Sequence, residues 1–587
     1  MSASIYKVGM DYGTTNSAIA YLEEEGDSTL YKTVPESGSE PTLVFVGSDS
    51  RLKFGALAKK AACRGGGKSF QGFKMLIGEN EEALLQKGAE KAFLPREITR
   101  QYIRNLLSRY LKDVQRGEDH YRVDELVVCV PAIWYEGEQA DNRGILMDIC
   151  REVLDELAPG PEGGKKHVRT LSEPVSASMY FVDRYQKHTG TPFSGYLLLV
   201  DYGGGTLDVT LNRIVPKTGE DGQVRPMVSL QGMWGAGENH DGRIGRAGMA
   251  YLQSVVETAW EEQQKEPLPK EKSSGYWDGV YSLEDELCSA EGQEEIEASF
   301  ALDVDVEALN KEEFRTIELF GEPLAVSFGL LYRCYEKTIR PVLGEALNQA
   351  KEFMKREKIS SAMKDADHFK IAMAGGFCNF YLVRRQVLEE LNCLEDDRRI
   401  LNESRSRCEQ AIAYGAALKA NDRMEDQMRT PYYLGIYNKE PSGDVAYWAV
   451  RKGDTIRYGE PQWIRLYDPV KKEYGEMGEF AFTNFTRLAI NTDDDPTHAY
   501  TGCIPEEASR ELRRVAQLNE DLFLRYRIGF AFDESSILSI YFEEGVYERA
   551  EWVSRKILGP IRIRGIGEIL GARMLNKWET VIDGGAR

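Results

Sequence analysis

The sequence lacks the residue patterns that mark metal-binding, disulfide-bonded and membrane proteins. Its nine cysteines form no Cys-x-x-Cys pair and only six histidines are present, so it contains no convincing zinc constellation. Cysteines in odd number and without pattern predict reduced thiols in a cytoplasmic protein. No apolar run approaches the ~20 residues of a membrane span, and no signal-peptide core follows the first methionine.

Positive charge is also scarce. The chain carries 74 lysines and arginines against 95 aspartates and glutamates, a net charge of −21. An acidic surface of this kind repels nucleic-acid phosphates and anionic lipid head groups. We therefore expect neither a nucleic-acid nor a membrane partner. A nucleotide pocket stays possible, because a ligand feels the field of its pocket more than the total charge. The length of 587 residues allows roughly three to five domains.

The sequence does contain an internal repeat. Residues 6–22 read YKVGMDYGTTNSAIAYL and residues 196–211 read YLLLVDYGGGTLDVTL. Each copy is an apolar strand, then Asp-Tyr-Gly, a run of small residues and a second strand, which predicts a β-hairpin. Two such hairpins predict two similar α/β halves that face each other.

The small residues in the two turns predict a phosphate-binding device. Small side chains let backbone N–H groups approach an anion closely, and two facing sets of donors would clamp a polyphosphate. The aspartates that enter the turns, Asp11 and Asp201, then lie where Mg²⁺ must be. Mg²⁺ keeps several waters, so we expect them to hold it through water. The turn residues are Gly13, Thr14, Thr15, Asn16, Gly203, Gly204, Gly205 and Thr206.

The remaining patterns predict the order of elements and domains. Residues 423–431 are polar and predict a linker, and 432–555 carry short β-rich segments typical of a separate antiparallel β domain with a helix at 509–518. Residues 556–587 are a weakly patterned tail. Within the first 422 residues we expect strands at 125–131 and 369–374, a strand leading into a helix over 168–184, helical structure over 239–326, and helices at 138–154, 328–358, 381–391 and 411–420.

Six segments, in order, resemble the 70-kDa heat-shock (DnaK-type) chaperones. Besides the two hairpins they are FKMLIG (73–78), VVCVPAIW (127–134), TLSEPVSASMYF (170–181), and IAMAGGF with QAIAYGAALKA (371–377 and 410–420). The resemblance covers roughly residues 5–421. It implies an α/β fold, a two-lobed actin-like ATPase domain over 1–422 built from duplicated ribonuclease H-like halves, with ATP or ADP and Mg²⁺ as ligands.

The resemblance also implies roles for single residues. Lys74 would approach the γ-phosphate and offset its charge, whereas an isolated lysine would be read as a solvated surface residue. Glu173 and Asp201 would position water and magnesium, with the Thr206 hydroxyl beside the phosphates, although Glu173 before a proline can simply end a strand. Asp208 is either a base-side carboxylate or a surface residue. The implied adenosine-side residues are Gly237, Glu238, Gly375, Gly376, Phe377 and Glu409.

The base side departs from the family. Phe377 and Asn379 stand where the family has serine and arginine, and the cations expected near residues 287–293 are missing. We therefore expect adenine to stack on Phe377 or a neighbour, with weaker affinity or relaxed base choice. Residues 423–430 are also more polar than the family's linker, which puts nucleotide-driven docking of the domains in doubt.

In the β domain, residues 433–436 and 527–542 resemble the family's peptide-binding domain. Only about 45 residues follow, too few for a full helical lid. The leading hypothesis is a slow ATPase that couples nucleotide state to binding of a polypeptide client, with a possible co-chaperone. The alternative is a nucleotide-regulated scaffold that binds one dedicated partner with little or no hydrolysis. Residues 62–69 (ACRGGGKS) match a loose P-loop pattern, but no strand precedes them, so we reject it.

Overall fold

The computed structural model describes residues 6–25, 28–64, 66–86, 90–117, 121–135, 141–158, 167–219, 222–236, 248–264, 268, 274–301, 305–430, 432–440, 443–464, 467–468, 473–474, 487–491, 500–501, 525–533, 537–548 and 551–562. These residues form a mixed α/β structure with several sheets. The chain divides into two compact units, one of residues 1–130 with 147–426 and one of residues 131–146 with 427–587. Within the described ranges, no helix is long and apolar enough to cross a membrane.

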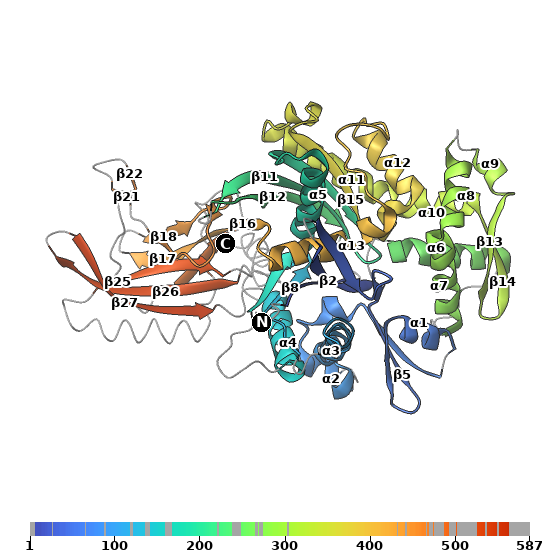
Figure 1. The fold of residues 1–587 in the computed structure, drawn as a ribbon, viewed down its shortest axis with the longest axis horizontal. Coiled ribbons are helices and arrows are strands. Elements are labelled where there is room, and N and C mark those ends of the chain that lie inside the picture. Colours follow the sequence, from blue (N-terminus) through green and yellow to red (C-terminus); the bar gives the residue numbers. More distant parts are fainter. Residues whose placement is uncertain are drawn as a thin grey trace, which may run out of the picture. The chain divides into compact units, whose positions relative to one another are not determined.

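The first sheet of the larger unit has the strand order β3-β2-β1-β8-β9 (Figure 1). Strands β1, β2 and β3 form an antiparallel meander, and β8 and β9 continue the sheet in parallel. The first predicted hairpin and the predicted strand at 125–131 are therefore confirmed. The bounds are β1 (Lys7–Tyr12), β2 (Asn16–Glu25), β3 (Ser28–Val34), β8 (Glu125–Val130) and β9 (His167–Ser172).

The second sheet repeats this plan. Four of its strands follow the order β15-β10-β11-β12, with β10, β11 and β12 as an antiparallel meander and β15 parallel to β10. A single parallel bridge from Ile371 to Ile400 extends the β15 edge. The sequence repeat thus corresponds to a repeated strand order. The bounds are β10 (Gly195–Tyr202), β11 (Leu207–Thr218), β12 (Val224–Ala236) and β15 (Phe369–Ala374).

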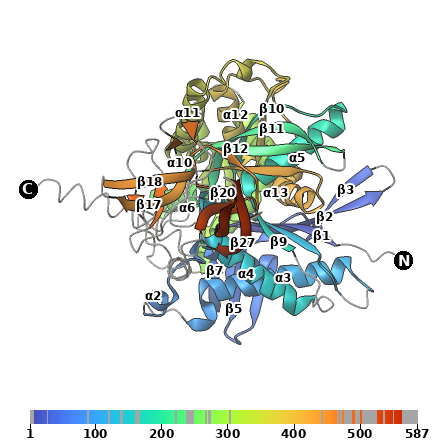
Figure 2. The same ribbon diagram turned by 90° about the vertical axis from the view of Figure 1, so that its left-hand side faces the viewer.

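Two helices, α5 (Glu173–Thr189) and α13 (Arg405–Ala420), pack against each other and against these sheets (Figure 2). They share one apolar core with residues of both sheets. The approach is close, because a Cβ on Gly415 would lie 1.7 Å from the Ser176 carbonyl oxygen. A glycine is therefore required where the helices cross. Helix α13 begins at Arg405, well before the predicted start at residue 411.

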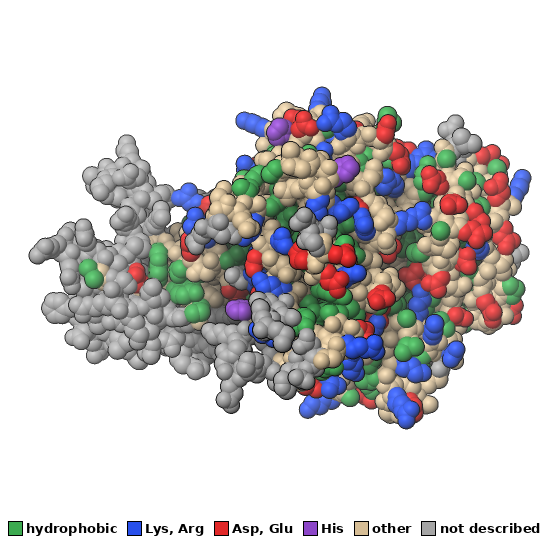
Figure 3. All heavy atoms as spheres, viewed as in Figure 1, with side chains coloured by type: hydrophobic (Ala, Val, Ile, Leu, Met, Phe, Trp, Pro, Cys, Tyr) green, Lys and Arg blue, Asp and Glu red, His purple; other side chains and the backbone are tan. Residues whose placement is uncertain are grey.

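The segment predicted to be helical over 239–326 contains α6 (Gly248–Gln264), α7 (Ser274–Cys288), α8 (Ala290–Phe300) and α9 (Val306–Leu309), but it ends in an unpredicted hairpin. Strands β13 (Glu313–Leu319) and β14 (Glu322–Ser327) pair there with alternating buried and exposed residues. Acidic side chains gather over this part of the surface (Figure 3). The predicted helix at 328–358 is divided at Ile339 into α10 (Phe328–Thr338) and α11 (Arg340–Arg356), because Pro341 cannot continue a helix interior.

The other described elements of the first half are short, apart from α3. Strand β7 follows helix α1, so the glycine-rich stretch at 62–69 lacks the strand before it that a P-loop requires. The bounds are β4 (Glu40–Pro41), β5 (Leu43–Gly47), β6 (Leu52–Phe54), α1 (Gly55–Arg64), β7 (Gly67–Gln71), the 3₁₀ turn η1 (Phe73–Leu76), α2 (Glu81–Gln86), α3 (Pro95–Val114), α4 (Asn142–Leu157) and, later in the chain, α12 (Tyr381–Glu390).

The smaller unit is rich in antiparallel strands. One sheet has the order β18-β17-β23-β24 and another β20-β25-β26-β27. The predicted hairpin at 527–542 is β25 with β26, and the unpredicted β27 follows, so the expected tail boundary at 556 falls inside a strand. The predicted helix at 509–518 lies outside the described residues. The main bounds are β17 (Tyr433–Glu440), β18 (Gly443–Val450), β23 (Arg487–Asn491), β25 (Arg525–Phe532), β26 (Leu538–Glu548) and β27 (Glu551–Arg562).

Candidate functional site

The turn between β1 and β2 is fixed by Thr42. The Thr42 backbone N–H donates to the Thr15 carbonyl at 2.7 Å, and the Thr42 hydroxyl donates to the Gly13 carbonyl at 2.8 Å. Thr14 lies between these two anchored residues, and Asn16 begins β2. Because the carbonyls of the turn are held this way, its conformation is set before any ligand arrives.

The turn between β10 and β11 is fixed by the start of α6. The Gly203 N–H donates to the Thr206 carbonyl at 3.0 Å, and the Gly248 and Met249 N–H groups donate to the carbonyls of Gly203 and Gly204 at 3.2 and 2.9 Å. The two turns carry the residues predicted to bind phosphate, and each lies at the end of its own sheet.

The two turns face each other, as the repeat predicts. A Cβ on Gly204 would lie 2.8 Å from the Thr15 side chain, and a Cβ on Gly205 would lie 2.8 Å from the Thr14 Cβ. Both distances are shorter than side chains tolerate, so this approach requires glycine. A Cβ on Gly203 meets nothing closer than 3.8 Å.

Four carboxylates and one lysine meet beside these turns. Asp11 and Asp201 are the second-last residues of β1 and β10, and Glu173 is the first residue of α5. The Lys74 ammonium lies 2.5 Å from a Glu173 carboxylate oxygen. Lys74 is 1% and Glu173 5% exposed, so neither is the surface residue that an isolated motif would suggest. Asp208 completes the set, since it is the pairing partner of Asp201 across the hairpin.

Burial dominates the electrostatics of this cluster. It raises the pKa of Asp11 to about 7, with repulsion from Glu173 adding to the rise and Lys74 opposing it. Burial likewise raises the pKa of Asp208 to about 7, and it raises the pKa of Asp201 well above its ordinary range, with Asp208 as the next cause. One ammonium thus serves four carboxylates, and desolvated anions in excess favour a bound cation.

The cluster suits a cation held through water. One carboxylate oxygen of Asp11 is buried without a hydrogen-bond partner. Within the described ranges, no three His, Cys, Asp or Glu side chains converge closely enough to ligate a metal directly. Mg²⁺ keeps most of its own waters, so carboxylates spaced this way fit its hydration shell better than its inner coordination sphere.

The Gly375-Gly376 pair joins the cluster to α13. Gly375 has a left-handed backbone (φ +81°), and a Cβ there would lie 2.8 Å from an Asp201 carboxylate oxygen, so only glycine fits. The Gly375 N–H donates to the Cys408 carbonyl at 3.3 Å. A Cβ on Gly376 would lie 3.9 Å from the Glu409 side chain. The structure therefore brings Gly375, Gly376 and Glu409 to the same place.

The Phe377 ring, which was expected to stack on the base, is half-buried among other aromatic rings. Its ring centroid lies 6.0 Å from that of Tyr251, 6.1 Å from Tyr202 and 6.2 Å from Phe380. A Cβ on Gly248 would be 2.0 Å from the Phe377 ring, so the ring also lies on the backbone of α6. This ring is a packing element of the aromatic core. Gly237 and Glu238 lie outside the described residues.

Helix α7 approaches from the other side with acidic residues. The Lys59 ammonium lies 2.9 Å from carboxylate oxygens of both Glu284 and Asp285, and the Tyr281 hydroxyl donates to the Gln71 side chain at 3.0 Å. This end of α7 therefore carries acidic side chains, and not the cations that were expected near residues 287–293. Lys59, from α1, neutralises the acids instead.

With this geometry in view, comparison with known proteins is informative. The chain is 24% identical over 426 residues to the chaperone protein DnaK of Thermosipho africanus, which covers 71% of this chain and 58% of that protein. It is 28% identical over 229 residues to the chaperone protein dnaK3 of Thermosynechococcus vestitus, covering 35% of this chain and 29% of that protein. The chain is similar to DnaK chaperones.

The similarity has limits. The chain spans less than two thirds of the length of these DnaK relatives. The identity to the DnaK of Thermotoga neapolitana is likewise low, at 23% over 431 residues. No family profile matches the chain.

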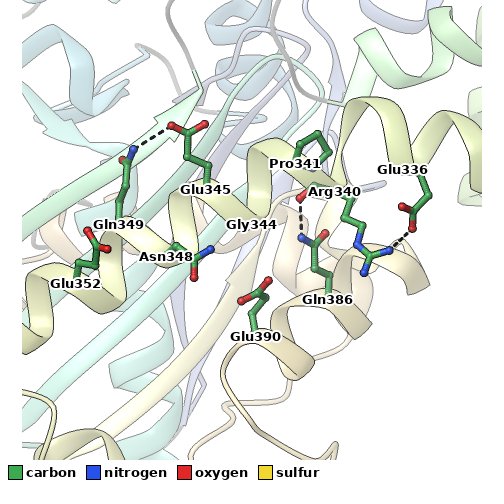
Figure 4. A pocket seen from close by; sticks show the side chains of 10 residues that line it. All are labelled: Glu336, Arg340, Pro341, Gly344, Glu345, Asn348, Gln349, Glu352, Gln386 and Glu390. Carbon is green, nitrogen blue, oxygen red and sulfur yellow. Dashed lines mark hydrogen bonds and ion pairs between the residues drawn. The ribbon is translucent and has the colours of Figure 1, made fainter.

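A groove of about 620 Å³, lined by none of the carboxylate-cluster residues, lies along α11 and against α12 (Figure 4). It contains four glutamates, of which Glu336 pairs with Arg340 and Glu390 with Lys351. An acidic groove of this kind does not suit phosphate. Its lining residues are Glu336, Arg340, Pro341, Gly344, Glu345, Asn348, Gln349, Glu352, Gln386 and Glu390.

The sequence left open whether Asp208 belongs to the site. A signal for it was present, because a four-residue turn after Tyr202 places Asp208 opposite Asp201 in the hairpin register.

Proposed function

We propose that the larger unit binds Mg-ATP. The observation that carries this proposal is the buried Lys74–Glu173 ion pair, which lies among three further carboxylates at the ends of two matched hairpins. The turns Gly13–Asn16 and Gly203–Thr206 would hold the polyphosphate. Asp11 and Asp201 would hold Mg²⁺ through water, and the similarity to DnaK chaperones supports ATP or ADP as the nucleotide.

We propose that ATP is hydrolysed slowly at this cluster. Phosphoryl transfer depends mainly on positioning and on offsetting charge, which the Lys74 ammonium does for the transferred group. Bound Mg²⁺ neutralises charge on the phosphates. Glu173 fixes the position of Lys74, and the Thr206 hydroxyl lies in the second turn. Asp208, with a pKa of about 7, suits a group that accepts the proton of the attacking water near neutral pH.

The proposed fold is a two-lobed actin-like ATPase domain over residues 1–422 with ribonuclease H-like halves. The shared strand order of its two sheets supports it. In this proposal residues 423–431 link it to a β domain that begins at residue 432, includes β27 and binds a polypeptide client, with a co-chaperone as a further partner. The antiparallel sheets of the smaller unit and the DnaK similarity support this reading.

One observation favours the alternative, a nucleotide-regulated scaffold with a single dedicated partner. Residues at the start of the proposed linker are tied to the larger unit by ion pairs of 2.6–2.7 Å: Arg423 to Glu24, Glu425 to Lys217 and Asp426 to Lys419. A polar segment held by ion pairs in this way differs from an apolar linker, which can bind to the larger unit and be released from it. In the scaffold, nucleotide acts as a conformational ligand.

Calorimetry with ATP and ADP, with and without Mg²⁺, combined with turnover assays in the presence of an unfolded peptide, separates these proposals. Peptide-stimulated turnover that disappears in Lys74→Ala supports the chaperone-type ATPase. Tight binding without turnover supports the scaffold. A chain that binds neither nucleotide rejects both.

A further inference from the structure

The Asp-Tyr-Gly repeat places a tyrosine directly after two aspartates of the cluster, and the two tyrosines have different surroundings. Tyr12 is the last residue of β1 and is fully buried. Because successive side chains of a strand point to opposite faces, Tyr12 projects away from the face of Asp11. Tyr202 ends β10, and its ring packs 6.1 Å from the Phe377 ring. The proposed phosphate contacts use the residues on either side of Tyr12 but give its ring no role.

The Tyr12 ring lies beside the ammonium of Lys74. The Lys74 Nζ atom is 5.6 Å from the centroid of the ring, within the roughly 6 Å of a cation–π contact. The same atom lies 2.5 Å from a Glu173 carboxylate oxygen. Lys74 is almost inaccessible, so water screens neither contact strongly. A carboxylate and an aromatic ring therefore both hold the ammonium.

Helix α3 and the turn η1 fix the position of this ring. The Tyr12 and Thr99 hydroxyls share a hydrogen bond of 3.0 Å. The ring centroid of Tyr102, also on α3, lies 6.2 Å from that of Tyr12, and the ring centroid of Phe73 lies 6.5 Å from it. All three neighbours are buried, so the Tyr12 ring has little room to turn. Phe73 precedes Lys74 in η1, so the ring contacts both the lysine and the turn that carries it.

A ring suits this place for an electrostatic reason. The cluster already sets four carboxylates against one ammonium, and a further carboxylate beside Lys74 would repel both its neighbours and a polyphosphate. An aromatic ring attracts an ammonium through its quadrupole and carries no net charge. Burial raises the pKa of Tyr12 well above its ordinary range, so the hydroxyl stays protonated and the ring stays neutral. The ring thus adds attraction for Lys74 without adding an anion.

We propose that Tyr12 is a positioning residue for Lys74, and that its ring, fixed by Thr99, holds the ammonium where it meets the transferred phosphoryl group. The inference rests on the proposed ATPase and names the group that orients its lysine. Without the ring, the flexible four-carbon stem of the lysine lets the ammonium move further among the carboxylates. Its charge is then misplaced when the phosphoryl group is transferred. Nucleotide binding is assigned to the backbone of the turns, so affinity changes little.

The test measures kcat and KM separately, on the full chain with ATP and Mg²⁺. Tyr12→Leu is expected to lower kcat about 5- to 30-fold, the range of a desolvated cation–π contact, and to change KM less than about threefold. Tyr12→Phe keeps the ring and is expected to retain at least about a third of kcat. A phenylalanine with a fluorinated ring at position 12 keeps the shape but weakens the attraction for a cation, so its kcat should fall below that of Tyr12→Phe.

Tyr110→Leu is the matched control. Tyr110 is an almost inaccessible tyrosine on the same helix as Thr99, about 16 Å further along it. We expect this variant to lower the melting temperature about as much as Tyr12→Leu does, with kcat within twofold of the wild type.

The outcomes separate this inference from the proposed function. A wild-type chain without turnover rejects the proposed ATPase, and with it the reaction that Tyr12 would serve. A wild-type chain that turns over, with Tyr12→Leu equal to it in kcat, overturns the inference alone. Equal kcat for Tyr12→Phe and its fluorinated counterpart also overturns it, and this comparison does not depend on whether Tyr12→Leu folds. Equal losses of kcat in Tyr12→Leu and Tyr110→Leu would assign Tyr12 to the stability of the fold.

Discussion

The phosphate side of the proposed site buries its charged groups, with one lysine among four carboxylates, whereas Glu409 on the base side is exposed. Lys74 and Glu173 are almost inaccessible and lie 2.5 Å apart. A change in a buried pair leaves an uncompensated charge, but a change on an exposed rim is absorbed by water. The sequence motifs that resemble DnaK chaperones include the residues of this buried side.

The largest effect in testing this contrast between buried and exposed charges is expected from Lys74→Ala. We expect turnover to fall by at least about 10²-fold, because a positioned charge at the reacting group is lost. The free energy of unfolding should also fall by about 3–5 kcal/mol, since Glu173 is left buried without its partner. Steady-state phosphate release and urea unfolding measure the two effects.

Lys68→Ala is the control for this variant. Lys68 pairs with Glu90 at 2.6 Å, but both side chains are more than half exposed. Its loss should change stability by less than about 1 kcal/mol. Similar losses for the two lysines would contradict the contrast between buried and exposed pairs.

A smaller effect is expected from methyl groups added to the facing turn. Gly204→Ala places a Cβ 2.8 Å from the Thr15 side chain, so the two turns must move apart. Because such overpacking costs about 1–2 kcal/mol, nucleotide affinity should drop about tenfold. Gly203→Ala, whose Cβ meets no protein atom closer than 3.8 Å, should lose less affinity than Gly204→Ala. Calorimetry with ATP distinguishes them, and equal losses would show that the approach of the turns is irrelevant.

The carboxylate cluster should make stability depend on pH. The pKa values of Asp11 and Asp208, about 7, lie above those of the unfolded chain, so the folded state holds protons that the unfolded state has released. This stabilisation is lost as pH rises through about 7. The ligand-free melting temperature should therefore be higher at pH 5.5 than at pH 8, and Mg²⁺ should raise it at pH 8.

Asp201→Asn isolates this effect from the chain's overall acidity. It removes one buried charge, so its melting temperature should exceed that of the wild type at pH 8 and respond less to Mg²⁺. Identical pH profiles for the two chains in scanning fluorimetry would contradict a cluster of buried, mutually repelling carboxylates.

The smallest effect is expected where α1 meets α7 near the base side. Lys59→Ala removes a half-buried cation that serves both Glu284 and Asp285, so nucleotide release should speed up a few-fold, in line with about 1 kcal/mol for such pairs. Lys60→Ala, an exposed neighbour, should leave release unchanged. Stopped-flow release of a fluorescent ADP measures both rates. Equal rates for the two variants would show that the Lys59 contact does not affect nucleotide release.

Prediction from sequence succeeded where a pattern is local. The hairpins, the strand at 369–374 and the strand-to-helix passage at Glu173 follow from apolar runs bounded by glycine or proline. Prediction failed where packing against residues distant in the sequence determines the local structure. Strands β13 and β14 alternate inward and outward within an acidic, helical neighbourhood, and α13 starts at Arg405, before its apolar residues begin.

By itself the sequence determined the repeat of two Asp-Tyr-Gly hairpins and the glycines that their turns need, since these depend on residues adjacent in the chain. Only the tertiary structure decided that Lys74 and Glu173 are buried against each other and that the Phe377 ring packs beside Tyr251. These depend on which surfaces bury one another, and a side chain's chemical role follows from that burial as much as from its type.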